Sequence, residues 1–308
     1  MKRLFCLLLS LCLLLLGCSA DEAEVEGYTF TDDLGRSVTV QNPSRVAILL
    51  GSYAEAWTLA GGSFCAAVDD AWEEYDLNII PEDAVNLGNT KSMSLELLLS
   101  VRPDFVIAST NTSQHLQWES TLEAAGIPVA YFDVYDFEDY LRMMKIFTDI
   151  TERPDCYETY GLAVEEEIQS IITESQARTN DPTVLVLRIS AATIRVRSSQ
   201  GSIPGEILRD LRCINIADSD ETLLENLSIE RILQEDPDHI FLAPYGDDQA
   251  GVQTHLERLL TEEPAWAQLT AVKEGRVHVM DKSLFSMKPN HRWAEAYAQA
   301  EEILANGP

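Results

Sequence analysis

The sequence predicts an α/β protein of two lobes with mostly parallel sheets, joined by a long helix. Three observations favour this fold. A short pattern of residues occurs twice, strand and helix patterns alternate through both halves of the chain, and the segment between the halves shows only helical periodicity. The length of 308 residues also suits about two domains.

The repeated pattern is the most informative feature. Residues 94–107 read SLELLLSVRPDFVI, and residues 228–241 read SIERILQEDPDHIF. In each copy the Ser is placed to cap a helix N-terminus, and the Glu lies in the first turn, where the helix dipole favours it. The Pro-Asp pair and the apolar run after it are typical of a helix exit followed by a fully buried strand. Two such units predict two lobes of one design.

In the N-terminal half, apolar runs and helical patterns alternate, predicting strands at Val46–Leu50, Phe105–Ala108 and Val129–Phe132 and helices at Tyr53–Leu59 and His115–Ala125. The second half repeats this rhythm, with predicted strands at Val184–Ile189, His239–Leu242 and Val277–Met280 and predicted helices at Ile203–Leu211, Gln253–Leu260 and His291–Ala305. Strands that alternate with helices indicate mostly parallel sheets.

Between the halves, segment 137–178 has apolar residues at helical spacing, with Pro154 as a break or kink. We therefore expect an N-terminal lobe over 28–136, a connecting helix over 137–178 and a C-terminal lobe over 179–308.

Residues 1–17 are typical of a secretory signal. Lys2 and Arg3 precede the apolar run Leu4–Leu16, which is too short to cross a bilayer comfortably. The sequence Leu-Leu-Gly-Cys ending at Cys18 resembles a bacterial lipobox, which implies cleavage before Cys18 and acylation of its thiol. Residues 18–27 would be a tether, and lipid would be the only attachment to the extracytoplasmic face of the cell membrane.

Charge and cysteines exclude several classes of protein. The formal net charge of −29 argues against nucleic acid as a partner, because a phosphate backbone would be repelled. Beyond Cys18, the mature chain keeps Cys65, Cys156 and Cys213, an odd and scattered set that predicts no disulfide framework and leaves their pairing open. No two histidines have metal-ligand spacing, and the common hydrolase and nucleotide-binding motifs are absent.

Several segments together resemble the class III solute-binding proteins of ABC importers, which bind iron–siderophores, haem and cobalamin. They are TDDLGRSVTV, NPSRVAIL, SLELLLSVRPDFVIAS, AGIPVAYFD, SIERILQEDPDHIFL and WAQLTAVKEGRVHVM, in this order. The resemblance implies two Rossmann-like lobes, a ligand cleft between them, no catalysis and no cofactor. It also implies a monomer that delivers a ferric siderophore, haem or cobalamin to an ABC permease and its ATPase subunits.

The resemblance also implies roles for particular residues. In the family, one glutamate per lobe pairs with arginines of the permease, and the matching positions are Glu96 and Glu230. Met93 lies in a segment that resembles the one in which haem-binding members use a Met ligand. The second ligand in those members is a His, where this chain has Tyr245. Tyrosinate also ligates ferric haem, so Met93 and Tyr245 are candidate iron ligands, although the departure weakens a haem assignment.

The remaining candidate ligand-binding residues follow from the fold class. Ligands of open α/β sheets bind outside the carboxyl ends of the strands. This rule selects Tyr53, Thr110, Asn111, Ser190, Tyr245 and Phe285. Arg292, with Arg195 and Arg197, is a candidate for contacts with an anionic ligand.

Two other functions stay open at this point. One is an enzyme on a similar fold, such as a tetrapyrrole chelatase, which would need a His/Glu pair at the cleft. The other is a surface sensor or adhesin without transport.

Overall fold

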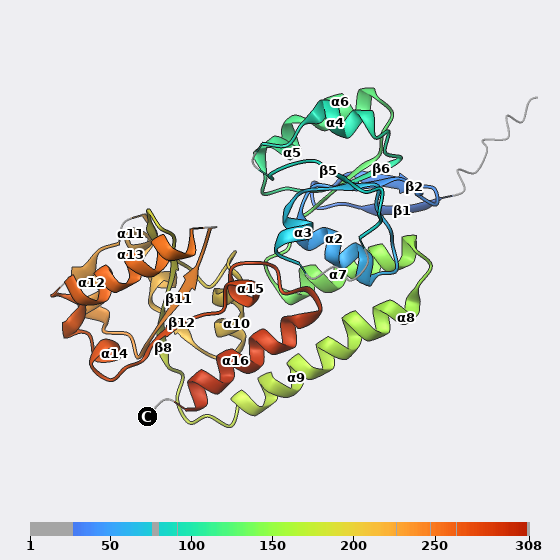
Figure 1. Ribbon diagram of the computed structural model, residues 1–308. Helices are drawn as coiled ribbons and strands as arrows, with labels where there is room; N and C mark the ends of the chain where they lie inside the picture. Colours follow the sequence, from blue (N-terminus) through green and yellow to red (C-terminus); the bar gives the residue numbers. More distant parts are fainter. Residues whose placement is uncertain are drawn as a thin grey trace, which may run out of the picture.

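The computed structural model describes residues 27–75, 80–90, 92–225, 227–246, 248–262 and 264–306. The signal peptide, Cys18 and nearly all of the tether lie outside the described residues. Two α/β lobes face one another, and a long helical segment runs along one side of both (Figure 1). This arrangement confirms the predicted fold class.

The N-terminal lobe is built on a five-stranded parallel sheet in the order β5-β4-β3-β6-β7. Its strands are β3 (Val46–Ile48), β4 (Ala66–Ala67), β5 (Val85–Asn86), β6 (Phe105–Ser109) and β7 (Val129–Phe132). A separate antiparallel hairpin, β1 (Tyr28–Thr31) and β2 (Ser37–Val40), precedes it. The outer helices are α4 (Leu95–Ser100), α5 (Ser113–Gln117) and α6 (Glu119–Ala124), and the helices on the other side are α2 (Gly51–Leu59), α3 (Asp70–Glu73) and α7 (Phe137–Ile150) (Figure 1).

The C-terminal lobe has the parallel order β10-β8-β11-β12, with β9 antiparallel to β8. Its strands are β8 (Thr183–Ile189), β9 (Ile194–Arg197), β10 (Ile214–Asn215), β11 (His239–Pro244) and β12 (Val277–Val279). Its helices are α10 (Ile203–Asp210), α11 (Glu221–Glu225), α12 (Ile229–Glu235), α13 (Gln249–Glu262), α14 (Thr270–Lys273), α15 (Lys282–Phe285) and α16 (Trp293–Ala305), with short 3-10 turns at Ile216–Ser219, Trp266–Gln268 and Asn290–Arg292.

The repeat seen in the sequence is also a repeat in structure. Ser94 and Ser228 cap α4 and α12 by accepting the backbone N–H of Leu97 and Arg231. Just after these helices, Arg102 and Asp236 have left-handed backbones, with φ of 49° and 41°.

The aspartates that end the two copies also have equivalent roles. Asp104 accepts hydrogen bonds from Ser44, next to β3, and Asp238 accepts them from Thr183 in β8. Asp104 therefore attaches β6 to its parallel neighbour β3, and Asp238 attaches β11 to its parallel neighbour β8.

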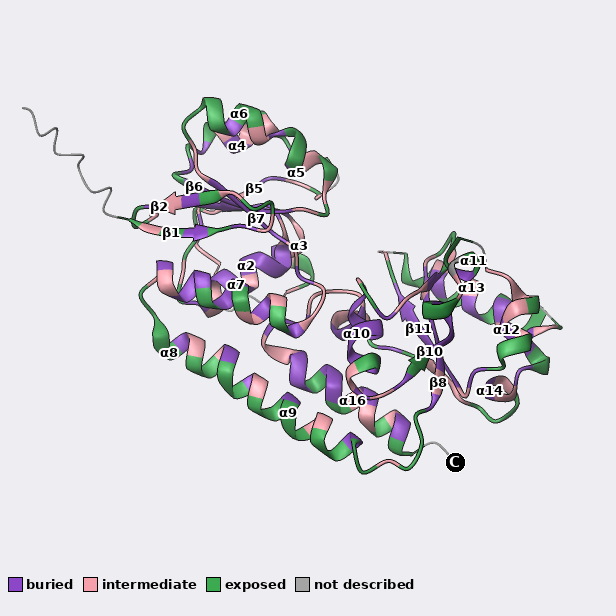
Figure 2. Cartoon of the chain, turned by 180° about the vertical axis from the view of Figure 1, so that it is seen from behind, coloured by how far each residue is buried: buried purple, intermediate pink, exposed green. Residues whose placement is uncertain are grey.

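The segment 137–178, expected as one connector, is divided by a turn. Helix α7 packs into the N-terminal lobe, and Glu152 in the turn after it has a φ of 57°. The long helix begins at Pro154 with α8 (Pro154–Tyr157), continues through one π turn (Glu158–Leu162) and ends as α9 (Ala163–Ser175). It buries one side and exposes the other (Figure 2).

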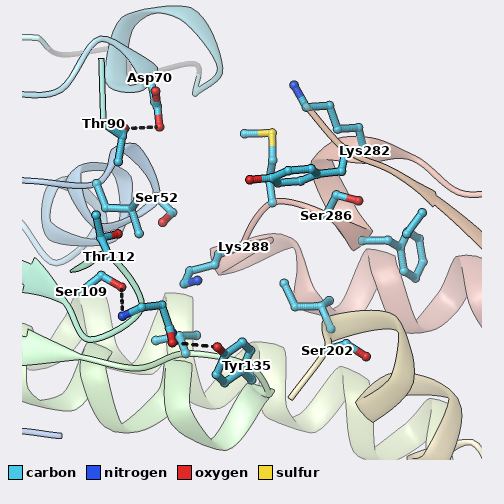
Figure 3. Close-up of a pocket in the computed structure, with 18 of the residues that line it drawn as sticks. Ser52, Asp70, Thr90, Ser109, Thr112, Tyr135, Ser202, Lys282, Ser286 and Lys288 are labelled. Atoms are coloured by element: carbon cyan, nitrogen blue, oxygen red, sulfur yellow. Dashed lines mark hydrogen bonds between the residues drawn. The ribbon is translucent and has the colours of Figure 1, made fainter. Parts of the chain in front are cut away.

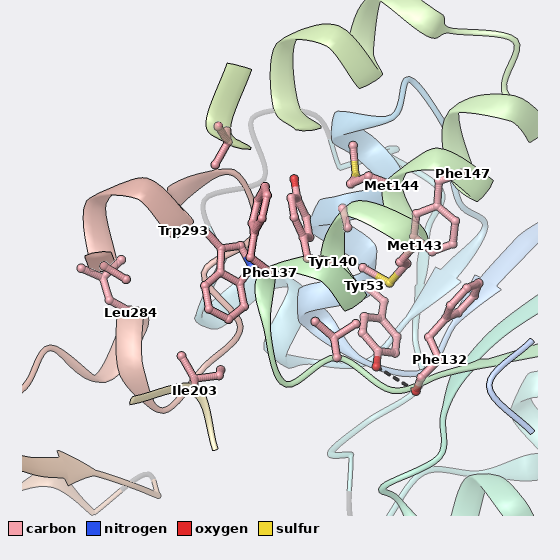
Figure 4. Packing of buried hydrophobic residues seen from close by; sticks show 14 of the residues in the cluster. Tyr53, Phe132, Phe137, Tyr140, Met143, Met144, Phe147, Ile203, Leu284 and Trp293 are labelled. Carbon is pink, nitrogen blue, oxygen red and sulfur yellow. Dashed lines mark hydrogen bonds between the residues drawn. The ribbon is translucent and has the colours of Figure 1, made fainter. Parts of the chain in front are cut away.

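One hydrophobic cluster belongs to both lobes. It includes Phe132 and Phe147 of the N-terminal lobe, Ile168 of α9, and Ile203 and Trp293 of the C-terminal lobe. Trp293 is fully buried, and its ring meets Phe137 edge-on at 6.3 Å between centroids (Figure 4). Two further clusters fill the outer side of each sheet separately.

The three cysteines among the described residues are free thiols. Cys156 and Cys213 are buried, and Cys65 is half-buried. Burial raises the pKa of the Cys213 thiol to about 12, so this cysteine behaves as an apolar packing residue.

Because the lobes share a core, Trp293→Ala should destabilise the whole molecule. We expect a loss of about 3–5 kcal/mol in the free energy of unfolding and one cooperative transition. The measurement is a denaturant titration monitored by circular dichroism. Leu162→Ala, at an exposed position of the connector, is the control and should change stability by less than about 0.5 kcal/mol. Two separate transitions, with only one shifted by Trp293→Ala, would contradict a shared core.

Candidate functional site

A cleft of about 710 Å³ lies between the lobes and is lined by residues from both. Its walls are formed where strands of the two sheets end, as shown by Ser109 at the end of β6 and Tyr245 after β11. The lining mixes many hydroxyl groups with a few apolar side chains and four cations. Figure 3 shows two of the cations, Lys282 and Lys288, among several of the hydroxyl groups. This position agrees with the expectation that the ligand site lies outside the carboxyl ends of the strands.

A chain of hydrogen bonds orders the N-terminal wall. The Asn111 amide donates to Asp133 Oδ1 at 2.5 Å, and its Oδ1 accepts the Tyr135 hydroxyl at 2.8 Å. Ser109 accepts the backbone N–H of Asn111, and the Ser109 N–H donates to Nδ1 of His115 at 3.0 Å. Burial lowers the pKa of His115 to about 4, so at neutral pH its ring is neutral and holds Ser109 in place.

The C-terminal wall carries two arginines on one face of the β8–β9 ribbon. In β8, Val184 and Val186 belong to the core shared by the lobes, whereas Leu185 and Leu187 face the outer cluster. Alternation therefore turns Arg188 to the inner side, where the cleft is. Arg197 pairs with Val186 in the ladder and lies on the same side.

Arg188 is stacked on Tyr245, with its guanidinium carbon 3.3 Å from the ring centroid. Burial and the nearby Arg197 lower the pKa of Arg188 from its usual value. Arg197 donates to the backbone oxygen of Gly201 at 3.1 Å. Among the described residues, no carboxylate lies within 4.0 Å of either guanidinium.

Two lysines reach the cleft from the C-terminal lobe. Lys282 crosses it and forms an ion pair with Glu74 at 2.8 Å. Lys288 points toward the N-terminal wall, with its Nζ 5.8 Å and 6.0 Å from the ring centroids of Tyr53 and Tyr135 (Figure 3). Burial lowers the pKa of Lys288 to about 8, although Asp133 and Asp139 act in the opposite direction.

A buried contact joins the lobes beside the cleft. Asn290, which is fully buried, donates its amide to the backbone oxygen of Ser52 at 2.8 Å and to Glu55 at 2.6 Å. Such buried hydrogen bonds are costly to break without a replacement, so they restrict how far the lobes separate.

Three of the residues predicted to bind ligand line the cleft, namely Asn111, Tyr245 and Phe285. The other five have structural contacts. Tyr53 is fully buried and donates to the Phe132 carbonyl at 3.0 Å. The Thr110 N–H donates to the same carbonyl.

Ser190 accepts from Thr193 in the β8–β9 turn. Arg292 forms an ion pair with Glu295 at 2.7 Å. Met93 is buried in the outer cluster of the N-terminal lobe, so its sulfur lies among apolar side chains on the opposite side of the sheet from the core that the lobes share.

Sequence reasoning missed Arg188 and Lys288. A signal for Arg188 was present, because it is the single charge in the apolar strand TVLVLRI. Lys288 carried no comparable signal, since a lone lysine in a loop is usually solvated.

Glu96 and Glu230 are exposed and lie on different lobes, in the first turns of α4 and α12. No ion pair to either carboxylate occurs within the described part of the chain. Among the described residues, there is also no cluster of three or more metal-binding side chains, and no helix has the length and apolar character needed to cross a membrane.

Comparisons with known proteins agree with this geometry. The chain is 23% identical to the Iron-uptake system-binding protein of Bacillus subtilis over 65% of this chain and 62% of that protein. It is 23% identical to the Fe(3+)-citrate-binding protein YfmC of the same organism, over 91% of this chain and 89% of the relative. A putative ABC transporter substrate-binding lipoprotein, YhfQ, also from B. subtilis, is 21% identical over 84% of this chain and 82% of its own.

The crystal structure of Staphylococcus aureus SirA complexed with staphyloferrin B has the same fold. Its TM-score is 0.70 at 19% identity, covering 90% of this chain and 98% of that one. The family model described as periplasmic binding protein matches residues 46–284, which is most of the chain. The chain therefore belongs to the periplasmic binding protein family, the extracytoplasmic substrate-binding components of ABC importers, and acts by binding and not by catalysis.

Proposed function

We propose that this protein captures a ferric siderophore outside the cytoplasm and delivers it to the permease of an ABC importer. The observation that carries the proposal is the cleft between the lobes, whose walls present hydroxyls and unpaired cations to a ligand. Siderophore complexes are rich in oxygen atoms and often anionic, so both kinds of group would bind them.

The cleft favours a siderophore over haem. A porphyrin needs an apolar crevice and an iron ligand. Met93 is buried in the outer cluster of its own lobe, and the ring of Tyr245 is stacked on Arg188. No histidine occurs among the described residues that line the cleft. The relatives named for iron uptake and ferric citrate, and the structure holding staphyloferrin B, support an iron chelate as the ligand class.

Capture would involve a small movement of the lobes. The shared core and the Asn290 contacts resist wide opening, so the cleft would close by small adjustments around the ligand. The ligand-bound protein would then dock on the permease through Glu96 and Glu230, and the subunits that hydrolyse ATP would drive release. Attachment to the membrane would be through lipid on Cys18, as the lipobox and the relative YhfQ suggest.

One measurement tests ligand and anchor together. Native mass spectrometry of protein extracted from membranes of its own host should give a chain starting at Cys18 with diacylglycerol and an iron complex bound. The visible spectrum should show the broad charge-transfer absorption of a ferric chelate. A Soret band or a corrinoid spectrum would contradict the siderophore, and an unlipidated N-terminus would contradict the anchor.

Docking is tested by charge reversal. Glu96→Lys combined with Glu230→Lys should lower iron uptake by more than about tenfold, because both carboxylates would then repel the arginines of the permease. Affinity of the purified protein for its ligand should not change. The control, Glu167→Lys with Glu257→Lys, makes the same charge change at two exposed positions elsewhere. Normal uptake by the first variant would remove the docking role.

Lys288 should give binding a pH dependence. Its pKa of about 8 means that the charge is present below that pH and lost as the pH rises through it. Affinity for an anionic ferric chelate should therefore be highest below about pH 8 and fall by up to about tenfold above it.

Lys288→Met should bind more weakly at pH 7, and its affinity should approach that of the wild type at high pH. Lys282→Met, which removes a lysine already paired with Glu74, should keep the wild-type profile. Parallel profiles for the wild type and Lys288→Met would contradict the role of Lys288.

A further inference from the structure

The unpaired arginines of the C-terminal wall define the charge of the ligand. We infer that the ligand is an anionic ferric polycarboxylate, whose carboxylates dock on Arg188 and Arg197. This inference rests on the proposed function and narrows it to one class of chelate.

The ribbon concentrates positive charge on one face. Arg188 lies directly opposite Arg195 in the antiparallel ladder, and Arg197 follows two residues later on the same strand. Like charges at opposing positions of a ladder destabilise it. The two guanidinium groups that line the cleft, those of Arg188 and Arg197, therefore need an anion nearby, and the described residues supply no carboxylate to either. Arg195 is exposed and lies outside the lining of the cleft.

Arg188 and Arg197 differ from most described arginines in lacking a carboxylate partner. Acidic residues outnumber basic ones by 51 to 22, and most described arginines have an acidic partner, such as Glu301 for Arg178 and Asp220 for Arg231. Acidic partners are therefore abundant in the chain, and the two carboxylates that line the cleft, those of Asp70 and Glu74, belong to the N-terminal lobe and form no ion pair with Arg188 or Arg197. Unpaired guanidinium groups facing a cavity are suited to bind carboxylates of a ligand in bidentate geometry.

Tyr245 prepares Arg188 for this contact. A guanidinium stacked on an aromatic ring is held flat, and its N–H donors point outward in its own plane. Less side-chain entropy is then lost when a carboxylate binds, because one orientation already dominates. Tyr245 would act as a positioning residue for the arginine.

The far end of the cleft orients the ligand. Asp70, which accepts the Thr90 hydroxyl at 3.0 Å, and Glu74 lie on the N-terminal side, where an anion would be repelled. Asp70 lies near the top of the view in Figure 3 and Tyr135 near the bottom, and Arg188 and Arg197 are close enough to Tyr135 for their charges to act on it. The carboxylates of the ligand would therefore turn away from Asp70 toward the arginines.

The test is to titrate ferric complexes into the mature chain and to measure binding by the quenching of its tryptophan fluorescence. The probes are ferric citrate, the ferric complex of a citrate-based siderophore, a neutral ferric trihydroxamate, and haem. We expect a ferric polycarboxylate to bind at least about tenfold more tightly than the neutral trihydroxamate. Raising the salt concentration should weaken that binding.

The variants Arg188→Gln and Arg197→Gln should each weaken binding of the polycarboxylate by about 10- to 100-fold, with unchanged circular dichroism. Arg188→Lys keeps the charge but loses the planar fork, so it should still bind about tenfold more weakly. Arg195→Gln is the matched control on the same ribbon, because Arg195 is exposed and lies outside the lining of the cleft. It should bind like the wild type.

Several outcomes would overturn the inference while leaving the proposed function intact. They are equal or tighter binding of the neutral trihydroxamate, and unchanged affinity in both glutamine variants. If only haem binds, and Arg188→Gln weakens that binding, the ligand is not a siderophore. The arginines would then still be part of the binding site. Failure of every probe to bind would overturn the inference.

Discussion

The hydrophobic cluster shared by the two lobes is the constraint on which the rest of the structure depends. Helix α7 brings Phe137 to it from the N-terminal lobe, α9 adds Ile168, and α16 brings Trp293 from the other side (Figure 4). Each sheet buries its inner face in this cluster, so neither lobe has a complete core alone. The cleft is consequently a fixed gap between two walls, and ligand binding must work with small displacements of those walls.

The cleft itself is polar and its charge is arranged unevenly. Arg188, Arg197 and Lys288 line it without an ion pair among the described residues, whereas Lys282 is paired with Glu74 and Asp70 belongs to the N-terminal side of the lining. A protein with a net charge of −29 repels anions at long range, so local unpaired cations are needed to hold one.

The internal repeat explains why the first turns of α4 and α12, on different lobes, have the same local structure. Both copies end their helix with a left-handed residue and fasten the next strand through an aspartate, Asp104 or Asp238. These shared anchors place Glu96 and Glu230 in equivalent first turns on separate lobes. The lobes differ on their inner sides, where α7 covers one sheet and α10 and α16 cover the other, and these helices provide the shared core.

The sequence by itself determined the α/β class, the two lobes, the main strands and the serine caps, because these depend on local periodicity and short-range hydrogen bonds. It also led to Asn111, Tyr245 and Phe285, because residues after parallel strands must lie at the edge of a sheet. Only the tertiary structure decided which strand-end residues face the cleft. Tyr53 satisfies that rule and is nevertheless buried, because its ring fills the core and its hydroxyl bonds to Phe132. Arg188 became a candidate for two reasons that residues close to it in the chain do not encode. The pairing of β8 with β9 places it on the same side of the sheet as Arg197, and no described carboxylate forms an ion pair with it.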